Sequence, residues 1–231
     1  MDRDRFIDVL GRTGLFGGLP GNLLESLAAA CVHRVYPRDQ YLWYQGDPGD
    51  RLVVVAAGLV KVVVHSEGGD QIVLAALGPP EVLGELALID EGPRSASVVA
   101  AEETSVLMIQ RTVLLRLMRQ DTALLEAMLR SIGALLRRLT EQTADLVFLD
   151  LGGRVAKLLL RLADEHGRRA DGSTVLDRRL NQTDLAQMVG ASRPAVNRIL
   201  QSFVSRGFVS IDGHAIVLRD EAALRRRAGM A

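Results

Sequence analysis

The sequence predicts an α+β fold in which an N-terminal antiparallel β-roll is followed by a long helix and a C-terminal winged helix-turn-helix domain. Short β-branched runs separated by turn residues fill residues 32–108, which is typical of an antiparallel roll or barrel. Apolar residues then repeat at helical steps, and two capped helical segments followed by a hairpin end the chain. We therefore expect three parts, residues 1–110, 111–149 and 150–231.

The composition excludes several classes of protein. The 231 residues balance 28 basic against 28 acidic side chains, and 48% are hydrophobic, which excludes a disordered chain. The longest apolar run, residues 52–60, is far shorter than the roughly 18 residues that span a bilayer. Residues 1–5 mix charges without an apolar run behind them, unlike a secretory signal. A single cysteine, Cys31, excludes an internal disulfide. We expect a cytoplasmic protein with no membrane partner.

The zero net charge is the sum of two unequal parts. Residues 1–150 hold 14 basic and 20 acidic side chains, whereas residues 151–231 hold 14 and 8. A basic C-terminal part is typical of a nucleic-acid-binding domain, although solvated surfaces carry imbalances of this size as well.

The β-branched runs recur at spacings of roughly 8 to 12 residues, which favours an antiparallel arrangement. Turn residues separate them, including residues 46–50, Gly58 and residues 67–70. The runs occupy residues 41–44, 52–55, 59–64, 71–74, 97–100 and 104–108.

A helical repeat follows Arg111 and predicts one long helix with a 3.5-residue period. Its apolar row consists of Leu125, Met128, Ile132, Leu135, Leu139, Gln142, Leu146 and Leu149, with Gln142 as the polar member. The row is either the seam of a dimeric coiled coil or the face that packs on the roll of the same chain. We favour the dimer, because a second row of Leu124, Leu129 and Leu136 is available to face the roll.

The C-terminal part begins with Asp150, which is placed to cap a helix over residues 151–166. Further along, Asn181 and the acid three residues later match a capping box. Gly190 ends that short helix, and Ser192 is expected to cap a second one. Two short helices joined by a glycine-containing turn form a helix-turn-helix. The Asp-Gly turn within residues 207–218 predicts a hairpin, the wing.

Residues 84–97 contain the groups that an anionic sugar ligand requires. Gly84 permits a close backbone approach, and a helix that starts there presents free N–H groups. Arg94 offers a planar guanidinium to a phosphodiester, and Ser95 offers a hydroxyl. Glu85 is able to accept a hydrogen bond from a ribose hydroxyl. A structural Glu85–Arg94 salt bridge in a tight roll fits the same residues, so both interpretations stay open.

The second helix of the helix-turn-helix carries candidate DNA contacts, because this helix enters the major groove with its first turns toward the bases. Its side chains there are Ser192, Arg193, Pro194, Asn197, Arg198 and Gln201. Arg193 and Arg198 match guanine O6 and N7. Gln182, Thr183 and Ser192, with His214 on the wing, are candidate phosphate contacts. The arginine run at residues 225–227 fits either a phosphate contact or a solvated end.

Gly-Glu-Leu-Ala-Leu at residues 84–88, followed by Pro-Arg-Ser at residues 93–95, resembles the phosphate-binding cassette of cyclic-nucleotide-binding domains. The whole chain resembles the cyclic AMP receptor protein family of bacterial transcription regulators. Gly46 and Gly58 in the roll, residues 148–150 at the hinge and residues 189–193 in the DNA-binding motif belong to this resemblance. It implies a β-roll sensor domain, a dimerisation helix and a winged helix-turn-helix.

The resemblance implies cyclic AMP as the allosteric ligand. Glu85 takes the ribose 2′-hydroxyl position, Arg94 and Ser95 take the cyclic phosphate positions, and Gly84 and Leu86 supply supporting backbone.

Two further positions depart from the family pattern that the resemblance implies. The base contacts of the family fall on Leu139 and Thr140, of which Leu139 has no hydrogen-bonding group. Pro194 stands where the family commonly has a glutamate that reads a cytosine. The guanine contacts should therefore remain, and the central position of the half-site should change.

The functional prediction is a homodimeric transcription regulator that binds a double-stranded DNA operator under ligand control, with RNA polymerase as a further partner if it is an activator. The alternative is a DNA-binding regulator whose roll binds another ligand, such as cyclic di-GMP, or none. A nucleophile–base set, a metal-ligand cluster and a phosphate-loop lysine are all missing from the sequence. Neither catalysis nor a metal cofactor is expected.

Overall fold

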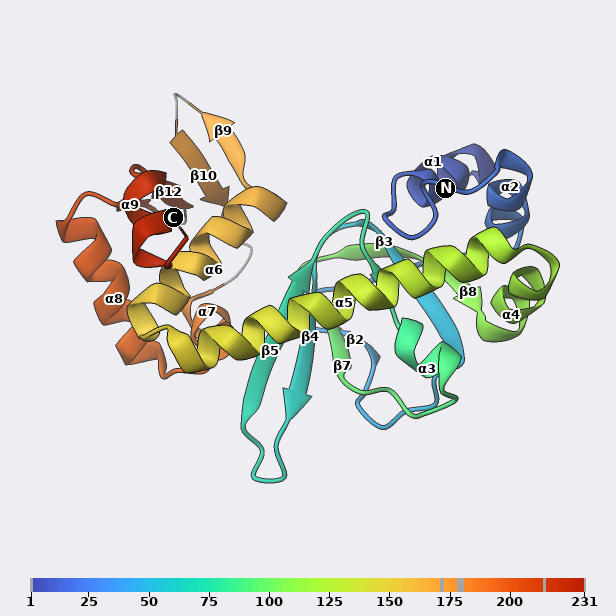
Figure 1. Ribbon diagram of the computed structural model, residues 1–231, viewed down its shortest axis with the longest axis horizontal. Helices are drawn as coiled ribbons and strands as arrows, with labels where there is room; N and C mark the ends of the chain where they lie inside the picture. Colours follow the sequence, from blue (N-terminus) through green and yellow to red (C-terminus); the bar gives the residue numbers. More distant parts are fainter. Residues whose placement is uncertain (1, 171–172, 178–180, 214, 231) are drawn as a thin grey trace. The chain divides into compact units, whose positions relative to one another are not determined.

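The computed structural model describes residues 2–170, 173–177, 181–213 and 215–230 (Figure 1). The chain divides into two compact units, Met1–Arg138, the N-terminal unit, and Leu139–Ala231, the C-terminal unit. The boundary between them falls inside helix α5 (Thr122–Phe148). Antiparallel sheets dominate the N-terminal unit, and helices surround a smaller sheet in the C-terminal unit. The predicted α+β fold class is confirmed.

The strands described in the N-terminal unit form two four-stranded antiparallel sheets, with the orders β1-β8-β3-β6 and β2-β7-β4-β5. Both sheets contribute to one hydrophobic core, with Val53 and Met108 from the first sheet and Val60 and Val98 from the second. The strands are β1 (Val32–Tyr36), β2 (Tyr41–Trp43), β3 (Arg51–Ala57), β4 (Val60–His65), β5 (Gln71–Leu77), β6 (Val82–Leu83), β7 (Ser97–Ala100) and β8 (Thr104–Gln110).

Strand β3 buries both of its faces. Val53 and Val55 lie in the core between the sheets, whereas Leu52 and Val54 belong to a second core on the outer side of the first sheet. Successive strand side chains point to opposite faces, so a strand covered on both sides has an unbroken apolar sequence. The second core also contains residues of α5, of α1 (Arg3–Gly11), α2 (Gly21–Ala29) and α4 (Arg111–Gln120), together with Leu88.

Helix α5 exposes an apolar row that matches the predicted one only in part. Leu124 and Met128 are buried in the second core, with exposed fractions of 0% and 1%. Leu129 and Leu136, expected to face the roll, are instead 61% and 64% exposed. The assignment of the rows is therefore confirmed only in part. Leu124 faces the core as predicted, and Leu125, Leu139 and Leu146 of the predicted seam are exposed, whereas Met128, Leu129 and Leu136 have the opposite exposure from the one expected. The exposed row of α5 contains Leu125, Leu129, Leu136, Leu139 and Leu146.

The C-terminal unit contains the predicted helix-turn-helix. Helix α7 (Gln182–Met188) begins with the predicted capping box, in which the backbone N–H of Asp184 donates to Asn181 Oδ1 and the N–H of Asn181 donates to Asp184 Oδ2, both at 2.9 Å. Gly190, with φ of 63°, turns the chain toward α8 (Arg193–Ser205).

The wing is present as the hairpin of β11 (Val209–Asp212) and β12 (Ala215–Leu218), which pair antiparallel. Its tip residue His214, a candidate phosphate contact, lies outside the described residues. The hairpin is part of a four-stranded sheet of order β11-β12-β10-β9, completed by β10 (Ser173–Asp177) and β9 (Arg168–Ala170).

Ser192 occupies the N-cap position of α8, but its side chain makes no capping hydrogen bond, so the predicted cap is wrong. An N-cap side chain bonds the N–H of the second or third helical residue. The second residue here is Pro194, which has no N–H, and the third, Ala195, donates to the backbone oxygen of Ser192 at 3.0 Å. The Ser192 hydroxyl is exposed and accepts no hydrogen bond from the first turn of α8.

Asp150 caps α6 (Leu151–His166) as predicted and also binds the end of α9 (Glu221–Arg227). Its Oδ1 accepts from the N–H of Gly153 at 2.8 Å, and its Oδ2 accepts from Arg227 Nη2 at 2.6 Å. The Arg227 guanidinium lies against Gly152, where a Cβ would overlap it. One member of the arginine run is therefore an internal partner of the α6 cap.

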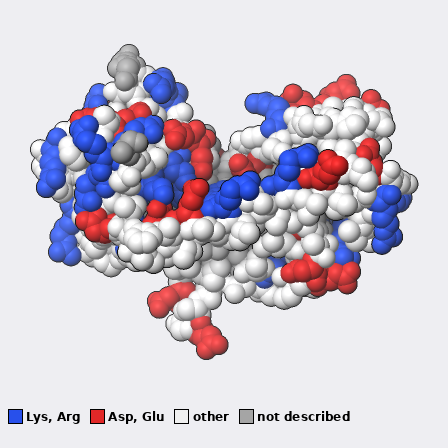
Figure 2. Space-filling view, viewed as in Figure 1, with Lys and Arg blue, Asp and Glu red and all other residues white. Residues whose placement is uncertain are grey.

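Charge is unevenly distributed on the surface. Figure 2 shows basic side chains over much of the visible face of the C-terminal unit, and acidic side chains at the tip of the β4–β5 hairpin. That tip contains Glu67 and Asp70. Among the helices that the structure describes, none combines the length and the apolar character needed to cross a membrane.

Replacement of Asp150 separates its two roles. Asp150→Ala should lower the free energy of unfolding by about 1 kcal/mol, because the α6 cap is lost. Asp150→Asn should cost less, because asparagine caps equally well and an exposed ion pair contributes little. Urea unfolding of each variant at neutral pH measures both effects, and equal losses for the two variants would contradict this assignment.

The same contact makes stability depend on pH. The hydrogen bonds from Arg227 and from the Gly153 N–H lower the pKa of Asp150. A carboxyl group with a lowered folded-state pKa contributes stability above its ordinary pKa and loses it as the pH falls through the lowered value. The difference between wild type and Asp150→Asn should therefore shrink in acid.

Candidate functional site

The cassette begins at Gly84, which precedes the short helix α3 (Glu85–Ile89). Gly84 has φ of 90° and ψ of 15°, a left-handed conformation that favours glycine. A Cβ at this position would overlap Nη1 of Arg94 and lie 3.1 Å from the backbone oxygen of Arg51. Glycine is therefore required both for the backbone conformation and for the approach of Arg94. Leu88 and Ala87 anchor α3 in the interior, with exposed fractions below 5%.

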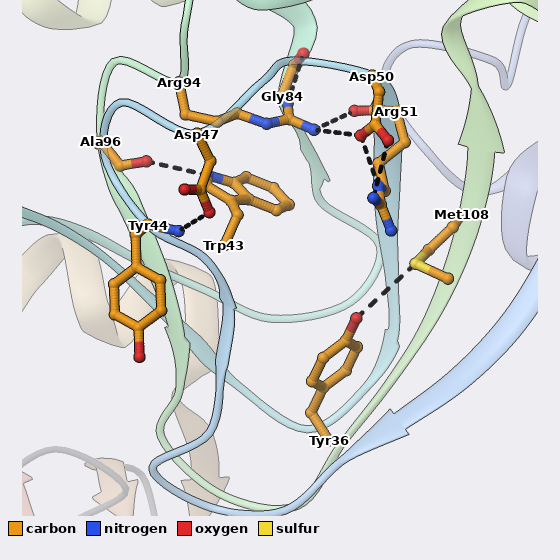
Figure 3. Close-up of polar contacts among 10 residues, drawn as sticks. All are labelled: Tyr36, Trp43, Tyr44, Asp47, Asp50, Arg51, Gly84, Arg94, Ala96 and Met108. Atoms are coloured by element: carbon orange, nitrogen blue, oxygen red, sulfur yellow. Dashed lines mark hydrogen bonds and ion pairs between the residues drawn. The ribbon is translucent and has the colours of Figure 1, made fainter.

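Arg94 is the centre of the cassette, and its side chain is only 2% exposed. Nη1 donates to the backbone oxygen of Gly84 at 3.3 Å, and Nη2 donates to that of Arg51 at 2.7 Å (Figure 3). The guanidinium carbon lies 4.1 Å from the centre of the Trp43 ring. Arg94 Nε is buried and has no hydrogen-bond partner within the described residues.

The charge of Arg94 is only partly balanced. Its ion partner is Asp50, with Nη2 and Oδ1 3.9 Å apart, and the Asp50 carboxylate is itself bound by Arg51 Nε and Nη2 at 2.7 and 2.8 Å. Burial lowers the pKa of Arg94, and Asp50 opposes that shift. The structural alternative of a Glu85–Arg94 salt bridge is not found among the described contacts. The cassette therefore holds a buried cation whose charge is only partly compensated within the described residues.

Glu85 is half-buried at the first position of α3. Burial of its carboxyl group raises the pKa of Glu85, and the negative charge of Glu81 acts in the same direction. The N–H groups of Glu85 and Gly84 and the charge of Arg94 oppose the increase. The Glu85 carboxyl group has already lost part of its hydration in the folded protein. Accepting a hydrogen bond from a ligand hydroxyl therefore costs it little further loss of hydration.

The other predicted ligand residues are on the surface. Leu86 is 39% exposed on α3, and Ser95 is exposed next to Arg94. Leu139 and Thr140 are exposed on the part of α5 that belongs to the C-terminal unit.

Sequence reasoning missed several residues that shape the cassette. Trp43, Asp50 and Arg51 surround Arg94, although they lie more than forty residues earlier in the chain. Arg111, the first residue of α4, donates from Nε to the backbone oxygen of Leu88 at 2.9 Å and from Nη2 to Glu91 at 2.6 Å. The local sequence signal for this region is the turn at residues 46–50. It predicts a bend in the chain but not the contacts of that bend with Arg94.

Most of the predicted DNA contacts are exposed side chains of the helix-turn-helix. Val196, Leu200 and Phe203 bury the opposite face of α8. Asn197 is half-buried and accepts from Gln182 Nε2 of α7 at 3.4 Å. The exposed members are Ser192, Arg193, Pro194, Arg198, Gln201 and, on α7, Thr183.

A β-roll with a buried arginine cassette, followed by a winged helix-turn-helix, defines a ligand-regulated, DNA-binding transcription regulator. The family model of the cyclic nucleotide-binding domain matches residues 33–121, and that of the Crp-like helix-turn-helix domain matches residues 153–227. These two matches cover the cassette and α8, respectively.

Known proteins resemble the chain over nearly its whole length. The CRP-like cAMP-activated global transcriptional regulator of Mycobacterium tuberculosis is 34% identical over 96% of this chain and 99% of its own. The structure of the Thermus thermophilus catabolite activator protein is 32% identical, with a TM-score of 0.54 over 94% of this chain and 100% of that one. FixK2 from Bradyrhizobium japonicum, 21% identical, shares the fold with a TM-score of 0.76 over 85% and 96%. The chain belongs to the cyclic AMP receptor protein family of bacterial transcription regulators, which confirms the resemblance seen in the sequence.

Two glycines allow the Gly84–Arg94 approach to be tested. Gly84 and Gly46 have φ of 90° and 91°, but a Cβ at Gly46 meets nothing within 4 Å. Gly46→Ala should cost about 1 to 2 kcal/mol for the left-handed backbone alone. Gly84→Ala should cost at least about 1.5 kcal/mol more, because it displaces hydrogen bonds of a charged group. Urea unfolding gives both free energies, and equal values would refute the close approach.

Proposed function

We propose that the cassette binds a cyclic nucleotide, cyclic AMP, and that binding controls the DNA affinity of the C-terminal unit. The observation that carries the proposal is the buried Arg94, whose Nε lacks a partner and whose counter-ion Asp50 is shared with Arg51. A buried charge that is not fully compensated is costly. One phosphodiester anion would supply both the missing charge and the missing acceptor.

Each group of the cassette has a defined role in this proposal. Arg94 and the Ser95 hydroxyl bind the cyclic phosphate, and Glu85 accepts a hydrogen bond from the ribose 2′-hydroxyl. Gly84 and Leu86 provide backbone against the ligand. The cAMP-activated relative from M. tuberculosis supports the choice of ligand. No metal ion has a part in this chemistry.

Leu139 and Thr140 of α5 complete the proposed ligand site at the base. Thr140 offers a hydroxyl to the purine, whereas Leu139 offers only apolar contact. A hydrogen bond to a base edge is worth roughly 0.5 to 1.5 kcal/mol, so its loss at Leu139 broadens the choice of base more than it weakens binding. Cyclic di-GMP is therefore included below as a competing ligand.

We propose a homodimer formed through the exposed row of α5. Leu129, Leu136 and Leu146 are each about 60% exposed. Their spacings of 7 and 10 residues are sums of the three- and four-residue steps of a coiled-coil seam. In this assembly residues 1–110 form the sensor, residues 111–149 the dimerisation helix and hinge, and residues 150–231 the DNA-binding domain. The dimer acts in the cytoplasm, and it contacts RNA polymerase if it is an activator.

The proposed DNA contacts follow from the exposed surface of α8. Arg193 and Arg198 read guanines, and Asn197 and Gln201 face the same groove. Pro194 leaves the central base pair without a polar contact. Ser192, Gln182 and Thr183 bind backbone phosphates. In the dimer the two α8 helices would lie about 34 Å apart, one helical turn of DNA.

Calorimetry with cyclic AMP tests the ligand. Arg94→Leu should weaken binding by at least about 100-fold, because two or more charge-assisted hydrogen bonds are lost. Arg116→Leu, which removes an exposed arginine of α4, should leave binding unchanged. Arg94→Lys keeps the charge without the planar fork and should fall between them. Negligible heats for both wild type and Arg94→Leu would defeat the cyclic AMP proposal, and heats from cyclic di-GMP alone would favour the alternative ligand.

Selection of DNA from a random pool, with and without cyclic AMP, tests the second function. Arg193→Ala and Arg198→Ala should each cost about 1 to 3 kcal/mol and relax the preference for guanine at one position. Arg206→Ala, at the exposed C-terminal end of α8, should preserve the selected sequence. If the Arg193→Ala variant selects the same DNA sequence as the wild-type protein, Arg193 does not take part in base recognition.

A further inference from the structure

Trp43, the single tryptophan of the chain, lies beneath the Arg94 guanidinium. The ring is 9% exposed, and its centre is 4.1 Å from Arg94 Cζ. Its Nε1 donates to the backbone oxygen of Ala96 at 2.9 Å (Figure 3). The indole plane is therefore fixed at one end by the loop that carries Arg94 and Ser95. A tryptophan face attracts a cation strongly when water is excluded.

The contacts of Arg94 within the protein determine which of its N–H groups remain for a ligand. A guanidinium has five N–H donors in one plane. The described contacts use Nη1 for Gly84 and Nη2 for Arg51, and leave Nε without a partner. The nearest carboxylate, Asp50, is 3.9 Å away and already accepts two hydrogen bonds from Arg51. Contact with the face of Trp43 holds the cation and uses none of its N–H groups.

The segment that follows Trp43 also fixes the backbone of Arg94. The N–H of Arg94 donates to the backbone oxygen of Asp47 at 2.8 Å, and the N–H of Gly46 donates to the backbone oxygen of Arg94 at 2.9 Å. The turn is closed by the Tyr44 N–H, which donates to Asp47 Oδ2 at 2.8 Å. One short segment thus sets both the main-chain position and the guanidinium plane of Arg94.

We infer that Trp43 is a positioning residue for ligand recognition, whose indole face holds the Arg94 guanidinium so that its N–H edge stays available to an anionic phosphodiester. The inference rests on the proposed cyclic-nucleotide function. A ring held in this way gives the ligand an arginine that is already oriented, so little side-chain entropy is lost on binding. An aliphatic side chain at position 43 fills part of the space but gives the cation no π face.

Substitutions at position 43 test this role by calorimetry with cyclic AMP on the full chain. Trp43→Leu should weaken binding about tenfold, as expected for a desolvated cation–π contact. Trp43→Phe keeps an aromatic face and should stay within about threefold of wild type, since phenylalanine gives a weaker contact of the same kind. Val106→Ala, a cavity in the same core cluster, is the control for lost stability and should bind normally. Trp43→Met replaces Trp43→Leu if the latter does not fold.

The emission of this sole tryptophan gives an independent readout. In the absence of nucleotide, Arg94→Leu should change the Trp43 emission and Arg116→Leu should not. In a double-mutant cycle, Trp43→Leu should have little further effect on affinity once Arg94 is leucine.

Three results would overturn the inference. These are wild-type affinity in Trp43→Leu, equal weakening by Val106→Ala, and independent effects of positions 43 and 94. A wild-type protein that binds neither cyclic AMP nor cyclic di-GMP would instead defeat the proposed function itself, and the positioning role with it.

Discussion

The burial of one positive charge constrains the N-terminal unit. Arg94 is withdrawn from water, and such a charge persists only where hydrogen bonds and nearby charges compensate for lost hydration. Three parts of the roll supply that compensation: Trp43 at the end of β2, Asp50 and Arg51 at the start of β3, and Gly84 before α3. The compensation is incomplete at Nε. The roll is thus organised around a group that an anion would complete.

The fold class and the features that depend on neighbouring residues were predictable from the sequence. The Asn181 capping box, the Asp150 cap and the wing hairpin are all where short patterns placed them, because each depends on residues a few positions apart. The Ser192 side chain makes no capping bond, because Pro194 has no N–H and the N–H of Ala195 donates to the Ser192 backbone oxygen. A local pattern is thus reliable only when its neighbours supply the partners it needs.

The sequence could not predict what depends on distant contacts. Apolar residues of α5 stand next to one another in the sequence, and only packing against the roll decides that Met128 is buried and Leu129 exposed. The cassette was found through Gly84 and Arg94, but the residues that orient Arg94 come from strands far away in the chain. The backbone oxygen of Arg51, for example, accepts a hydrogen bond from Arg94, which lies 43 positions later in the chain. A pattern reveals which groups a site contains, and the fold reveals how many of their donors remain unused.

The contact between Asp150 and Arg227 brings the first turn of α6 to the last turn of α9, 77 positions later. The helix-turn-helix domain therefore begins and ends at nearly the same point. Domains with adjacent ends tolerate transplantation and circular permutation. Because α7, α8 and the wing all lie between Asp150 and Arg227 in the chain, the two ends meet without the DNA-binding elements taking part in the contact.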